Sequence, residues 1–355
     1  MYSCTKLSSL MATCNGVWAP TSLSYFTASF SGFLVLLVVA GNGFVMLAIA
    51  RDPLKKLRSP FNYFLFNLAL SDFTIGAITM PTSVKYHIQE SYGQCKETVI
   101  ALMHMSYFLS ATTSVFSLAV LSIDRFCAIR WPIRYRRMVT AKRCALVCAA
   151  IWFTSAALTT FYLLIGYIRS LMVFIHTAVL VTLVILLLTY IQVYRAFRAQ
   201  ILELKRLKRA SDAYTYNQLN TIRLEKKVTR AFLWILGCFI ASYTPAIIMI
   251  YILETCTHCD CTLWHCLRDA TFLIVSANSG MNPLVCAFRL KVFRRSIALA
   301  FKRKVVITLS SSIKDLGIET AASKQQLGQQ QQQQQQQTLL QVASLKVNRD
   351  ESTSS

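Results

Sequence analysis

The chain has 355 residues, of which 55% are hydrophobic and only 15% are charged, and its formal net charge is +22. The charged residues stand mostly in the gaps between long apolar runs, a pattern typical of a helical membrane protein and not of two soluble domains. The basic residues flank these runs without zinc-finger spacing or an aromatic-interleaved basic domain. We therefore exclude nucleic acid as a partner and expect the positive charge to attract anionic membrane lipid.

Seven apolar stretches predict an all-α integral membrane protein, a seven-transmembrane helix bundle. Each stretch is close to the length of about 20 residues that a tilted helix needs to cross the hydrocarbon core of a bilayer. The expected helices cover residues 24–50, 61–87, 98–129, 144–167, 171–193, 228–253 and 264–288. We therefore expect a membrane domain over residues 24–288, preceded by an extracellular N-terminus at residues 1–23.

Two segments of different composition follow the membrane domain. Residues 289–304 are basic and amphipathic, which predicts a short eighth helix lying along the membrane interface. Residues 305–355 are polar and contain the polyglutamine tract Gln329–Gln337. This composition predicts a disordered cytoplasmic tail.

The distribution of basic residues predicts the orientation in the membrane. Lysine and arginine concentrate after the first, third and fifth apolar stretches, at residues 51–58, 130–143 and 195–230. Loops rich in these residues stay on the cytoplasmic side of a membrane. We therefore expect the N-terminus outside and the C-terminus inside the plasma membrane.

The cysteines divide between the two sides of the predicted membrane. Seven fall on the outer side, where disulfides persist, and five of these are disulfide candidates: Cys95, Cys256, Cys259, Cys261 and Cys266. An odd number leaves one cysteine free or bridging two chains. A zinc site that uses His258 and His265 is the alternative, but disulfides are favoured in an oxidising compartment.

The third apolar stretch organises the chain, because a long uncharged run that starts at Ser106 is followed abruptly by Asp124 and Arg125. This pattern predicts a buried helix whose last turn meets the cytoplasm. Arg125 either extends to the interface or pairs with Glu225 at the start of the sixth helix. Pro245 should kink that sixth helix, so a kinked helix tethered by an ion pair is a candidate two-state element.

Asp72 is the one carboxylate that we expect deep in an apolar helix, where a charge is expensive. Oxygen-bearing side chains are expected at a similar depth in other helices: Asn42, Ser114, Asn278, Ser279 and Asn282. Gathered around one carboxylate, such oxygens would suit a small hard cation such as Na⁺. A neutral Asp72 hydrogen-bonded among the amides, with no ion, explains the same residues equally well. We expect no other metal site.

Taken together, these residues resemble the rhodopsin-like (class A) family of G-protein-coupled receptors. The resemblance covers residues 24–302 and lies in an ordered series of motifs: Gly41-Asn42, Leu68 to Asp72, Asp124-Arg125-Phe126, Pro132, Tyr135, Trp152, Tyr190, Phe239 to Pro245, Asn282-Pro283 and Phe293. Any one motif alone is weak, whereas all of them in order inside a seven-helix pattern are specific.

The resemblance implies roles for individual residues. The residues of the family's allosteric sodium pocket are matched here by Asp72, Ser114, Asn278, Ser279 and Asn282. This match favours a bound Na⁺ ion over a neutral Asp72 without an ion. The switch that couples to a heterotrimeric G protein is matched by Asp124, Arg125, Ile133, Tyr190 and Glu225. Structural positions of the family are matched by Asn42, Trp152, Phe239, Pro245 and Pro283.

The resemblance also implies a mechanism and partners. Arg125 would contact the Gα subunit once the sixth helix swings outward, and Glu225 would be its partner in the inactive state. An extracellular ligand and the G protein would favour the same open state, so activation would be a population shift. Arrestin and a receptor kinase are further implied partners.

Several positions depart from the family's pattern. The tryptophan of the sixth helix is Tyr243 here, the tyrosine after the seventh-helix proline is Cys286, and Thr182 replaces the proline of the fifth helix. Cys95 lies too early for the usual outer disulfide. The missing proline, a minimal second outer loop and a cysteine-rich third outer loop resemble the melanocortin, adenosine and lipid receptor branch.

The resemblance also bears on the ligand. Tyr107 stands where amine receptors of this family carry an aspartate, and Ser276 stands where opsins carry the retinal-binding lysine. The side chains expected around the ligand are mostly aromatic or apolar: His87, His104, Tyr107, Phe108, Ala111, Tyr243, Ile247, Ile250, Phe272 and Ser276. Some of them would merely pack helix against helix. Such a lining favours a neutral, lipid-like or peptide ligand over a simple biogenic amine.

Two other classes stay open at this stage. A transporter or channel would carry internal repeats and broken helices in corresponding positions, and the sequence displays neither. A receptor-like protein without G-protein coupling, a scaffold or decoy, is motivated by Tyr243 and Cys286. An enzyme is excluded, because no Ser/His/Asp set, metalloprotease motif or phosphate loop stands in an accessible place. No cofactor is expected beyond the Na⁺ ion.

Overall fold

The computed structural model describes residues 17–51, 59–94, 96–165, 180–207, 213–256, 259–289 and 332–333. The chain divides into two compact units, Met1–Ile297 and Ala298–Ser355. Nearly all described residues belong to the first unit. In the second, Gln332 and Gln333 are helical, and the rest of the predicted tail lies outside the described residues. The predicted interface helix over residues 289–304 lies outside them too, apart from its first residue.

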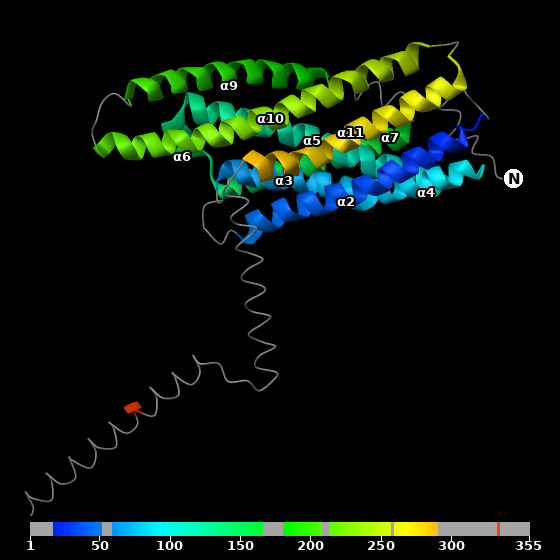
Figure 1. Cartoon of the computed structure of the whole chain (residues 1–355), viewed down its shortest axis with the longest axis horizontal. Helices are drawn as coiled ribbons and strands as arrows, with labels where there is room; N and C mark the ends of the chain where they lie inside the picture. The colour runs from blue at the N-terminus through cyan, green and yellow to red at the C-terminus, as the bar shows by residue number, and fades with distance from the viewer. Residues whose placement is uncertain are drawn as a thin grey trace, which may run out of the picture. The chain divides into compact units, whose positions relative to one another are not determined.

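The described part of the first unit consists of helices without a strand, in agreement with the predicted all-α fold. In chain order they are α2 (Thr21–Arg51), α3 (Pro60–Thr74), the π-helix η1 (Ile75–Thr79), α4 (Met80–Ser91), α5 (Glu97–Arg130), α6 (Pro132–Met138), α7 (Ala141–Ile165), α9 (Leu180–Leu207), α10 (Ala213–Thr255) and α11 (Cys261–Arg289). Since α3, η1 and α4 continue one another, the long helices form seven rods that lie side by side (Figure 1).

The bundle has two ends, which we name by their residues. The Glu90 end carries the start of α2, the end of α4 and the start of α11. The Arg125 end carries the end of α2, the end of α5 and the short helix α6. Through these two ends the bundle would meet water.

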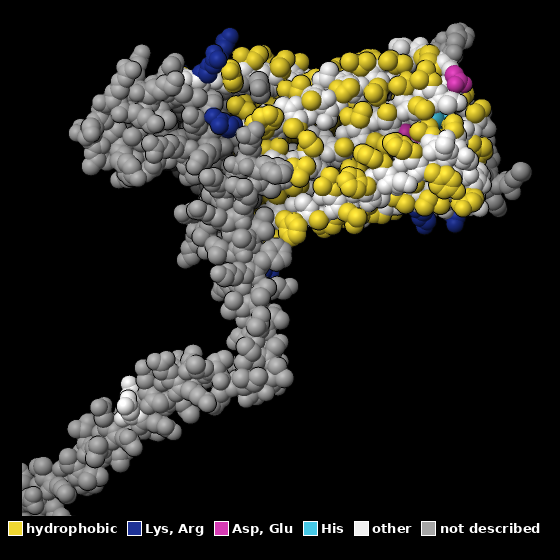
Figure 2. Space-filling model, in the orientation of Figure 1, with side chains coloured by type: hydrophobic (Ala, Val, Ile, Leu, Met, Phe, Trp, Pro, Cys, Tyr) yellow, Lys and Arg dark blue, Asp and Glu magenta, His cyan; other side chains and the backbone are white. Residues whose placement is uncertain are grey.

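The outer surface of the rods is apolar enough to face lipid. Five helices have the length and composition of membrane spans: Thr21–Arg51, Pro60–Ser91, Glu97–Ala128, Ala141–Thr160 and Leu233–Leu253. Large apolar side chains point away from the bundle, including Leu36 at 72% and Phe153 at 79% exposure. Figure 2 shows hydrophobic side chains spread over the visible face, with Lys and Arg toward its ends. Such a surface is stable in a bilayer and not in water.

The other two rods are also long enough to span. Helix α9 has 28 residues and α11 has 29, but α11 carries Arg268 and Asp269 in its first half, which lowers its apolar character. Both α9 and α10 extend well past the predicted apolar stretches, at the end of α9 and the start of α10. Lysine, arginine, glutamate and glutamine are good helix formers, so the helices continue beyond the apolar stretches that predicted them.

The second predicted helix is interrupted, which the apolar pattern did not reveal. Its middle is the π-helix Ile75–Thr79, which begins three residues after Asp72. Pro81 stands just beyond it and has no backbone N–H to donate to a residue four positions earlier. The local widening therefore coincides with a position where regular α-helical hydrogen bonding cannot continue.

Helix α5 lies at the centre of the bundle, as its sequence predicted. Val115 and Leu121 are fully buried, and α5 packs against α3, α7 and α9. Close approach of α2 and α11 depends on Gly41, because a Cβ atom there would lie 2.9 Å from the ring of Pro283. A Cβ atom on Gly76 of η1 would likewise lie 2.9 Å from the side chains of Val38 and Val39 on α2. Small residues thus allow three rods to pack tightly, as is common in membrane bundles.

Candidate functional site

The first polar group in the bundle surrounds Asp72, which is 1% exposed. Ser114 on α5 donates a hydrogen bond to Oδ1 of Asp72 at 3.0 Å, and Asn282 on α11 donates to Oδ2 at 2.7 Å. Ser71 and Ser114 are hydrogen-bonded to each other at 2.8 Å. Three rods therefore meet at one carboxylate. We call the following set the Asp72 cluster: Asn42, Asp72, Ser114, Asn278, Ser279 and Asn282.

Asn42 and Asn278 complete this cluster, and each retains a free acceptor. Nδ2 of Asn42 donates to the backbone carbonyls of Val38 at 3.0 Å and Ser279 at 3.1 Å. Within the described part of the chain, Oδ1 of Asn42 and Oδ1 of Asn278 are buried without a hydrogen-bond partner. Buried oxygens rarely stay unsatisfied, so these atoms have the capacity to accept from water or to bind a cation.

A neighbouring contact holds the structural tryptophan that the resemblance named. Nε1 of Trp152 on α7 donates to Oδ1 of Asn67 on α3 at 3.0 Å, and Nδ2 of Asn67 donates to Ser117 on α5 at 2.8 Å. These bonds join three rods through side chains alone. Trp152 thus fixes α7 against the centre of the bundle.

The second polar group lies at the Arg125 end. The guanidinium of Arg125 donates to Oδ2 of Asp124 through Nε at 3.0 Å and through Nη2 at 2.6 Å. The hydroxyl of Tyr135 on α6 donates to Oδ1 of the same carboxylate and accepts from Arg125 at 3.4 Å. The guanidinium also lies 4.7 Å above the ring of Phe61 on α3. We call Asp124, Arg125 and Tyr135 the Arg125 lock.

The environment of the lock keeps the Tyr135 phenol protonated. Burial and the neighbouring Asp124 carboxylate raise the pKa of Tyr135 well above its usual range. The phenol is therefore a hydrogen-bond donor at neutral pH. The predicted partner of Arg125, Glu225, has its side chain outside the described residues, as do Ile133 and Tyr190.

The aromatic residues predicted around a ligand come together from α5, α10 and α11. Tyr107 and Phe272 lie with ring centroids 5.3 Å apart, and Tyr243 is stacked on Phe239 at 4.1 Å. Phe108, Ala111, Ile247 and Ser276 are buried, whereas His104 and Ile250 are partly exposed. Oγ of Ser276 has no hydrogen-bond partner in the described structure. The set thus offers apolar and aromatic surface with one unused hydroxyl.

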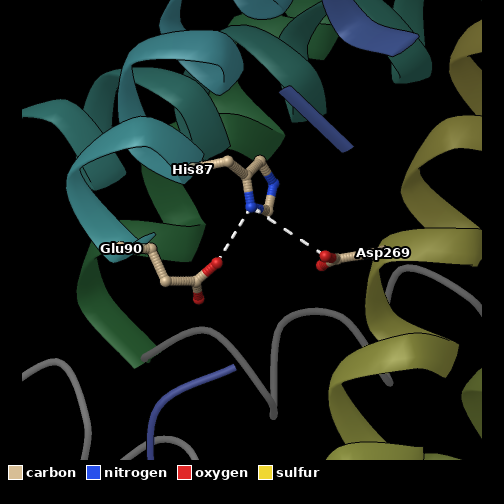
Figure 3. A group of neighbouring side chains, drawn as sticks. All are labelled: His87, Glu90 and Asp269. Carbon is tan, nitrogen blue, oxygen red and sulfur yellow. Dashed lines mark hydrogen bonds and ion pairs between the residues drawn. The ribbon is translucent and has the colours of Figure 1, made fainter. Parts of the chain in front are cut away.

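His87 does not belong to that aromatic set but to a third polar group. Its Nδ1 lies 3.0 Å from Oε2 of Glu90, one turn later on α4, and 3.9 Å from Oδ2 of Asp269 on α11. Figure 3 shows the imidazole ring between the two carboxylates. Arg268 contacts the remaining oxygens, with Nη2 3.1 Å from Oε1 of Glu90 and Nε 2.7 Å from Oδ1 of Asp269. We call Tyr86, His87, Glu90, Arg268 and Asp269 the Glu90 cluster.

The Glu90 cluster adds two buried carboxylates that the sequence analysis did not single out. Glu90 and Asp269 are both 3% exposed, although their sequence positions indicated helix ends. Hydroxyls of α2 also reach this cluster, since Ser24 donates to Glu90 at 2.9 Å and Thr27 donates to Asp269 at 3.0 Å. A sequence signal did exist, because two charges stand side by side in an otherwise apolar helix at residues 268–269.

The cysteines agree in part with the predicted disulfides. Cys256 and Cys259 form a disulfide, and Cys261 is disulfide-bonded as well. Cys266 is a free thiol, which corrects its place among the disulfide candidates. Cys266 lies on the second turn of α11, where the helix fixes the direction of its side chain. It fits the prediction that an odd number of outer cysteines leaves one without a partner in the chain. Cys95 lies outside the described residues.

The alternative zinc site among these cysteines gains no support from His265. Its Nε2 lies 3.1 Å from the backbone carbonyl of Val17, so the ring is engaged with the chain before α2. His258 lies outside the described residues. The cysteines expected to be reduced in the helices or on the cytosolic side are free thiols: Cys127, Cys144, Cys148, Cys238 and Cys286.

Comparison with known proteins agrees with this architecture. The profile of the family described as 7 transmembrane receptor (rhodopsin family) matches residues 41–170. The chain is similar to the D(1)-like dopamine receptor of Takifugu rubripes, with 24% identity covering 79% of this chain and 70% of the relative. It is similar to the adenosine receptor A2b of Mus musculus, with 27% identity covering 77% and 89%, and to the histamine H2 receptor of Cavia porcellus, with 26% covering 74% and 75%. Adenosine receptors thus stand beside dopamine and histamine receptors, and no single branch is favoured.

Proposed function

This chain belongs to the rhodopsin family of seven-transmembrane receptors, and we propose that it passes a signal from an extracellular ligand to a heterotrimeric G protein by outward movement of α10. It is a G-protein-coupled receptor that crosses the membrane several times, and its relatives are receptors and not enzymes.

The observation that carries the proposal is the Arg125 lock. Arg125 is nearly buried at the end of the central helix, yet its partners are its own neighbour Asp124 and Tyr135 of α6. An arginine held by local bonds is ready to exchange them for contacts with another protein without unfolding a helix. The described α10 contains Pro245, which removes one backbone hydrogen bond and supplies a hinge for the movement.

A nucleotide-exchange assay tests this role. The receptor in lipid nanodiscs should accelerate nucleotide exchange on purified Gα, and Arg125→Ala should reduce the acceleration by about tenfold or more, because a charge-assisted contact is lost. Arg130→Ala is the matched control, since Arg130 lies on the same helix but is exposed beside Trp131. No acceleration of any Gα class by the unmodified receptor would favour the scaffold or decoy function that Tyr243 and Cys286 suggest.

The proposed orientation has the Arg125 end in the cytoplasm. Arg51, Arg134, Arg137 and Arg143 lie at that end and are exposed. Under the positive-inside rule the N-terminus is then extracellular and the tail cytoplasmic. Arrestin and a receptor kinase would act on the same face and on the tail. Protease accessibility of tags at the two termini checks this orientation.

We expect the ligand to be a neutral molecule that is bound through aromatic contacts. The names of the relatives include dopamine and histamine, which are amines, and adenosine, which is an uncharged nucleoside. An amine needs a carboxylate partner, but the buried carboxylates in the described helices already have bonds of their own: Asp72, Glu90, Asp124 and Asp269. The ring pair of Tyr107 and Phe272 suits stacking on an uncharged aromatic group.

A screen of expressing cells distinguishes these ligand classes. Neutral agonists should be found, and Tyr107→Ala should weaken their potency by roughly tenfold through loss of aromatic contact. Ile248→Ala on the exposed, lipid-facing side of α10 is the control. Activation by protonated amines alone would contradict the expectation of a neutral ligand.

The Asp72 cluster fits a sodium ion that favours the inactive state. It offers a carboxylate, two serine hydroxyls and amide oxygens, and the unsatisfied Oδ1 atoms of Asn42 and Asn278 show spare acceptor capacity. Hard cations prefer such oxygen ligands. Asp72 would hold the charge of the ion, Ser114 would orient the carboxylate, and Asn282 would link the site to α11.

A further inference from the structure

We propose that His87, Glu90 and Asp269 form a binding site for a divalent transition-metal ion of the Zn²⁺ type at the Glu90 end of the bundle. Among the described residues, these three are the one group of histidine, cysteine and acidic side chains whose ligand atoms converge, all within 4.8 Å of one another. The site is separate from the Asp72 cluster and from the Arg125 lock. It would be reached from the extracellular side in the proposed orientation.

The distances suit the coordination geometry of zinc. Nδ1 of His87 lies 3.0 Å from Oε2 of Glu90 and 3.9 Å from Oδ2 of Asp269. A tetrahedral ion with bonds of about 2.0–2.1 Å keeps its ligand atoms about 3.3 Å apart. Small rotations of the side chains drawn in Figure 3 would therefore bring the three atoms into a coordination triangle, with water as a fourth ligand.

The remaining oxygens of the two carboxylates are held by Arg268, which orients the site. Arg268 contacts Oε1 of Glu90 and Oδ1 of Asp269, whereas Oε2 and Oδ2 face His87. The arginine therefore does not compete for the ligand atoms but fixes the carboxylates with one oxygen each toward the imidazole. Tyr86 adds a second anchor, because its hydroxyl donates to Oε1 of Glu90 at 2.9 Å. Such outer contacts orient metal ligands in known sites.

The hydroxyls of α2 leave room for a metal bond. Ser24 donates to Oε2 of Glu90 and Thr27 donates to Oδ2 of Asp269, so each ligand oxygen accepts one hydrogen bond from α2. A carboxylate oxygen has a second lone pair. On Oε2 of Glu90 the second contact is with Nδ1 of His87, and a metal ion would replace the proton between these two atoms. A metal ion can therefore bind at the lone pairs turned toward the imidazole while α2 keeps its contacts.

The charge of the cluster calls for a further cation. Glu90 and Asp269 supply two negative charges and Arg268 supplies one positive charge, so the two carboxylates outnumber the permanent cation by one. A buried excess charge is costly without compensation. The imidazole nitrogen selects a borderline transition metal over Na⁺ or Mg²⁺, which prefer oxygen alone. A metal ion at Nδ1 of His87 takes the place of a proton there: a neutral imidazole then carries its one proton at Nε2, and a protonated imidazole releases its second proton to solvent.

A second histidine stands near the site. His265 precedes Asp269 by four residues and therefore shares its face of α11, one turn closer to the Glu90 end. It is 4% exposed, and its Nδ1 has no hydrogen-bond partner in the described structure. A buried imidazole nitrogen without a hydrogen-bond partner thus lies on the same face of α11 as the ligand Asp269.

The test is thermal unfolding of the full-length receptor in nanodiscs after removal of metal by a chelator. Added ZnCl₂ should raise the melting temperature by several degrees at saturation, since an ion that binds the folded state alone stabilises it. MgCl₂ should give no comparable shift. His87→Gln keeps a hydrogen-bonding group toward Glu90 but should weaken the apparent zinc affinity by roughly tenfold or more, as should Asp269→Asn.

Two controls distinguish this site from other zinc ligands. Ser31→Ala removes the hydrogen bond between Ser31 and Ser83 on the same helices without touching a ligand, and Cys266→Ser removes a free thiol nearby; both should keep the zinc shift. If the ligand variants do not fold, Co²⁺ bound to the unmodified receptor should show tetrahedral visible bands without thiolate charge transfer. No zinc shift in the unmodified receptor, an undiminished shift in His87→Gln, or thiolate bands would each overturn the proposal. The binding readout is independent of G-protein coupling.

Discussion

The Asp72 cluster and the Glu90 cluster both join the α3–η1–α4 rod to α11, but they stabilise buried charge in different ways. Around Asp72 a single carboxylate is surrounded by neutral donors, Ser114 and Asn282. Around Glu90 two carboxylates share one arginine and one histidine. A lone carboxylate can be neutralised by a proton or by one small ion, so its environment tolerates change. A charge network depends on every member, because removing one leaves another uncompensated.

Among substitutions in the two clusters, removal of Arg268 should therefore cause the largest loss of stability. Arg268→Ala leaves Glu90 and Asp269 buried without their shared cation, and we expect a loss of about 3–5 kcal/mol in the free energy of unfolding. Thermal unfolding of purified receptor and surface expression would measure it. Arg143→Ala is the control, because Arg143 is exposed and donates one hydrogen bond to a backbone carbonyl. Similar melting temperatures for the two variants would show that the network is not cooperative.

Insertion of one methyl group beside the Asp72 cluster should have an intermediate effect. Gly41 adjoins Asn42, and a Cβ atom at this position would lie 2.9 Å from Pro283, which adjoins Asn282. Because the proline ring is rigid, α2 and α11 must separate, and Gly41→Ala should cost about 1–3 kcal/mol. Gly32→Ala on the same helix is the matched control, since a methyl group there would have no atom within 4 Å. Equal stability of both variants would contradict the close helix contact.

Neutralisation of Asp72 should cost less than either change. Asp72→Asn keeps the size of the side chain and one acceptor oxygen, and the amide of Asn282 can turn to present its own oxygen. We expect a change within about 1 kcal/mol, as for a typical hydrogen bond, together with loss of any effect of NaCl on basal nucleotide exchange. The measurement compares NaCl with KCl at equal ionic strength. A sodium effect that persists in Asp72→Asn would place the ion elsewhere.

The two clusters also differ in how readily the sequence revealed them. Asp72 stands alone in an apolar run, so its burial was predicted from contrast with its neighbours. Glu90 stands where the apolar run gives way to polar residues, and its position resembles a helix end facing water. Its pairing with Arg268, 178 residues later, depends on the packing of both α4 and α11 against α2, which hydropathy does not encode.

For the fold too, the sequence predicted some features and missed others. Apolar length predicted seven rods, because a span must bury its backbone hydrogen bonds in lipid whatever its neighbours are. The π-helix after Asp72 was missed, although Gly76 and Pro81 mark the place. The extension of α10 back to Ala213 was missed too, because polar helical turns carry no apolar signal. Contacts between residues far apart in the sequence thus determine the features of the fold that composition alone does not predict.

The Arg125 lock is intermediate in kind between the two clusters, because it holds one charged pair. A substitution in it should cause the smallest loss of stability. The lock contains one ion pair, and Tyr135 bridges both partners through its hydroxyl. Tyr135→Phe removes that bridge but leaves Asp124 paired, so the expected loss of stability is only about 0.5–1 kcal/mol. Basal nucleotide exchange should rise, because Arg125 is held less firmly.

The response of the lock to pH sharpens this prediction. A raised pKa means that the folded state favours the protonated phenol, so its contribution is complete below the unfolded pKa of about 10 and is lost only as pH rises above it. The difference in stability between the unmodified receptor and Tyr135→Phe should therefore stay constant between about pH 6 and 9. A difference that disappeared within this range would show that the hydroxyl does not act as the donor to Asp124, and the lock would then consist of the Asp124–Arg125 pair alone.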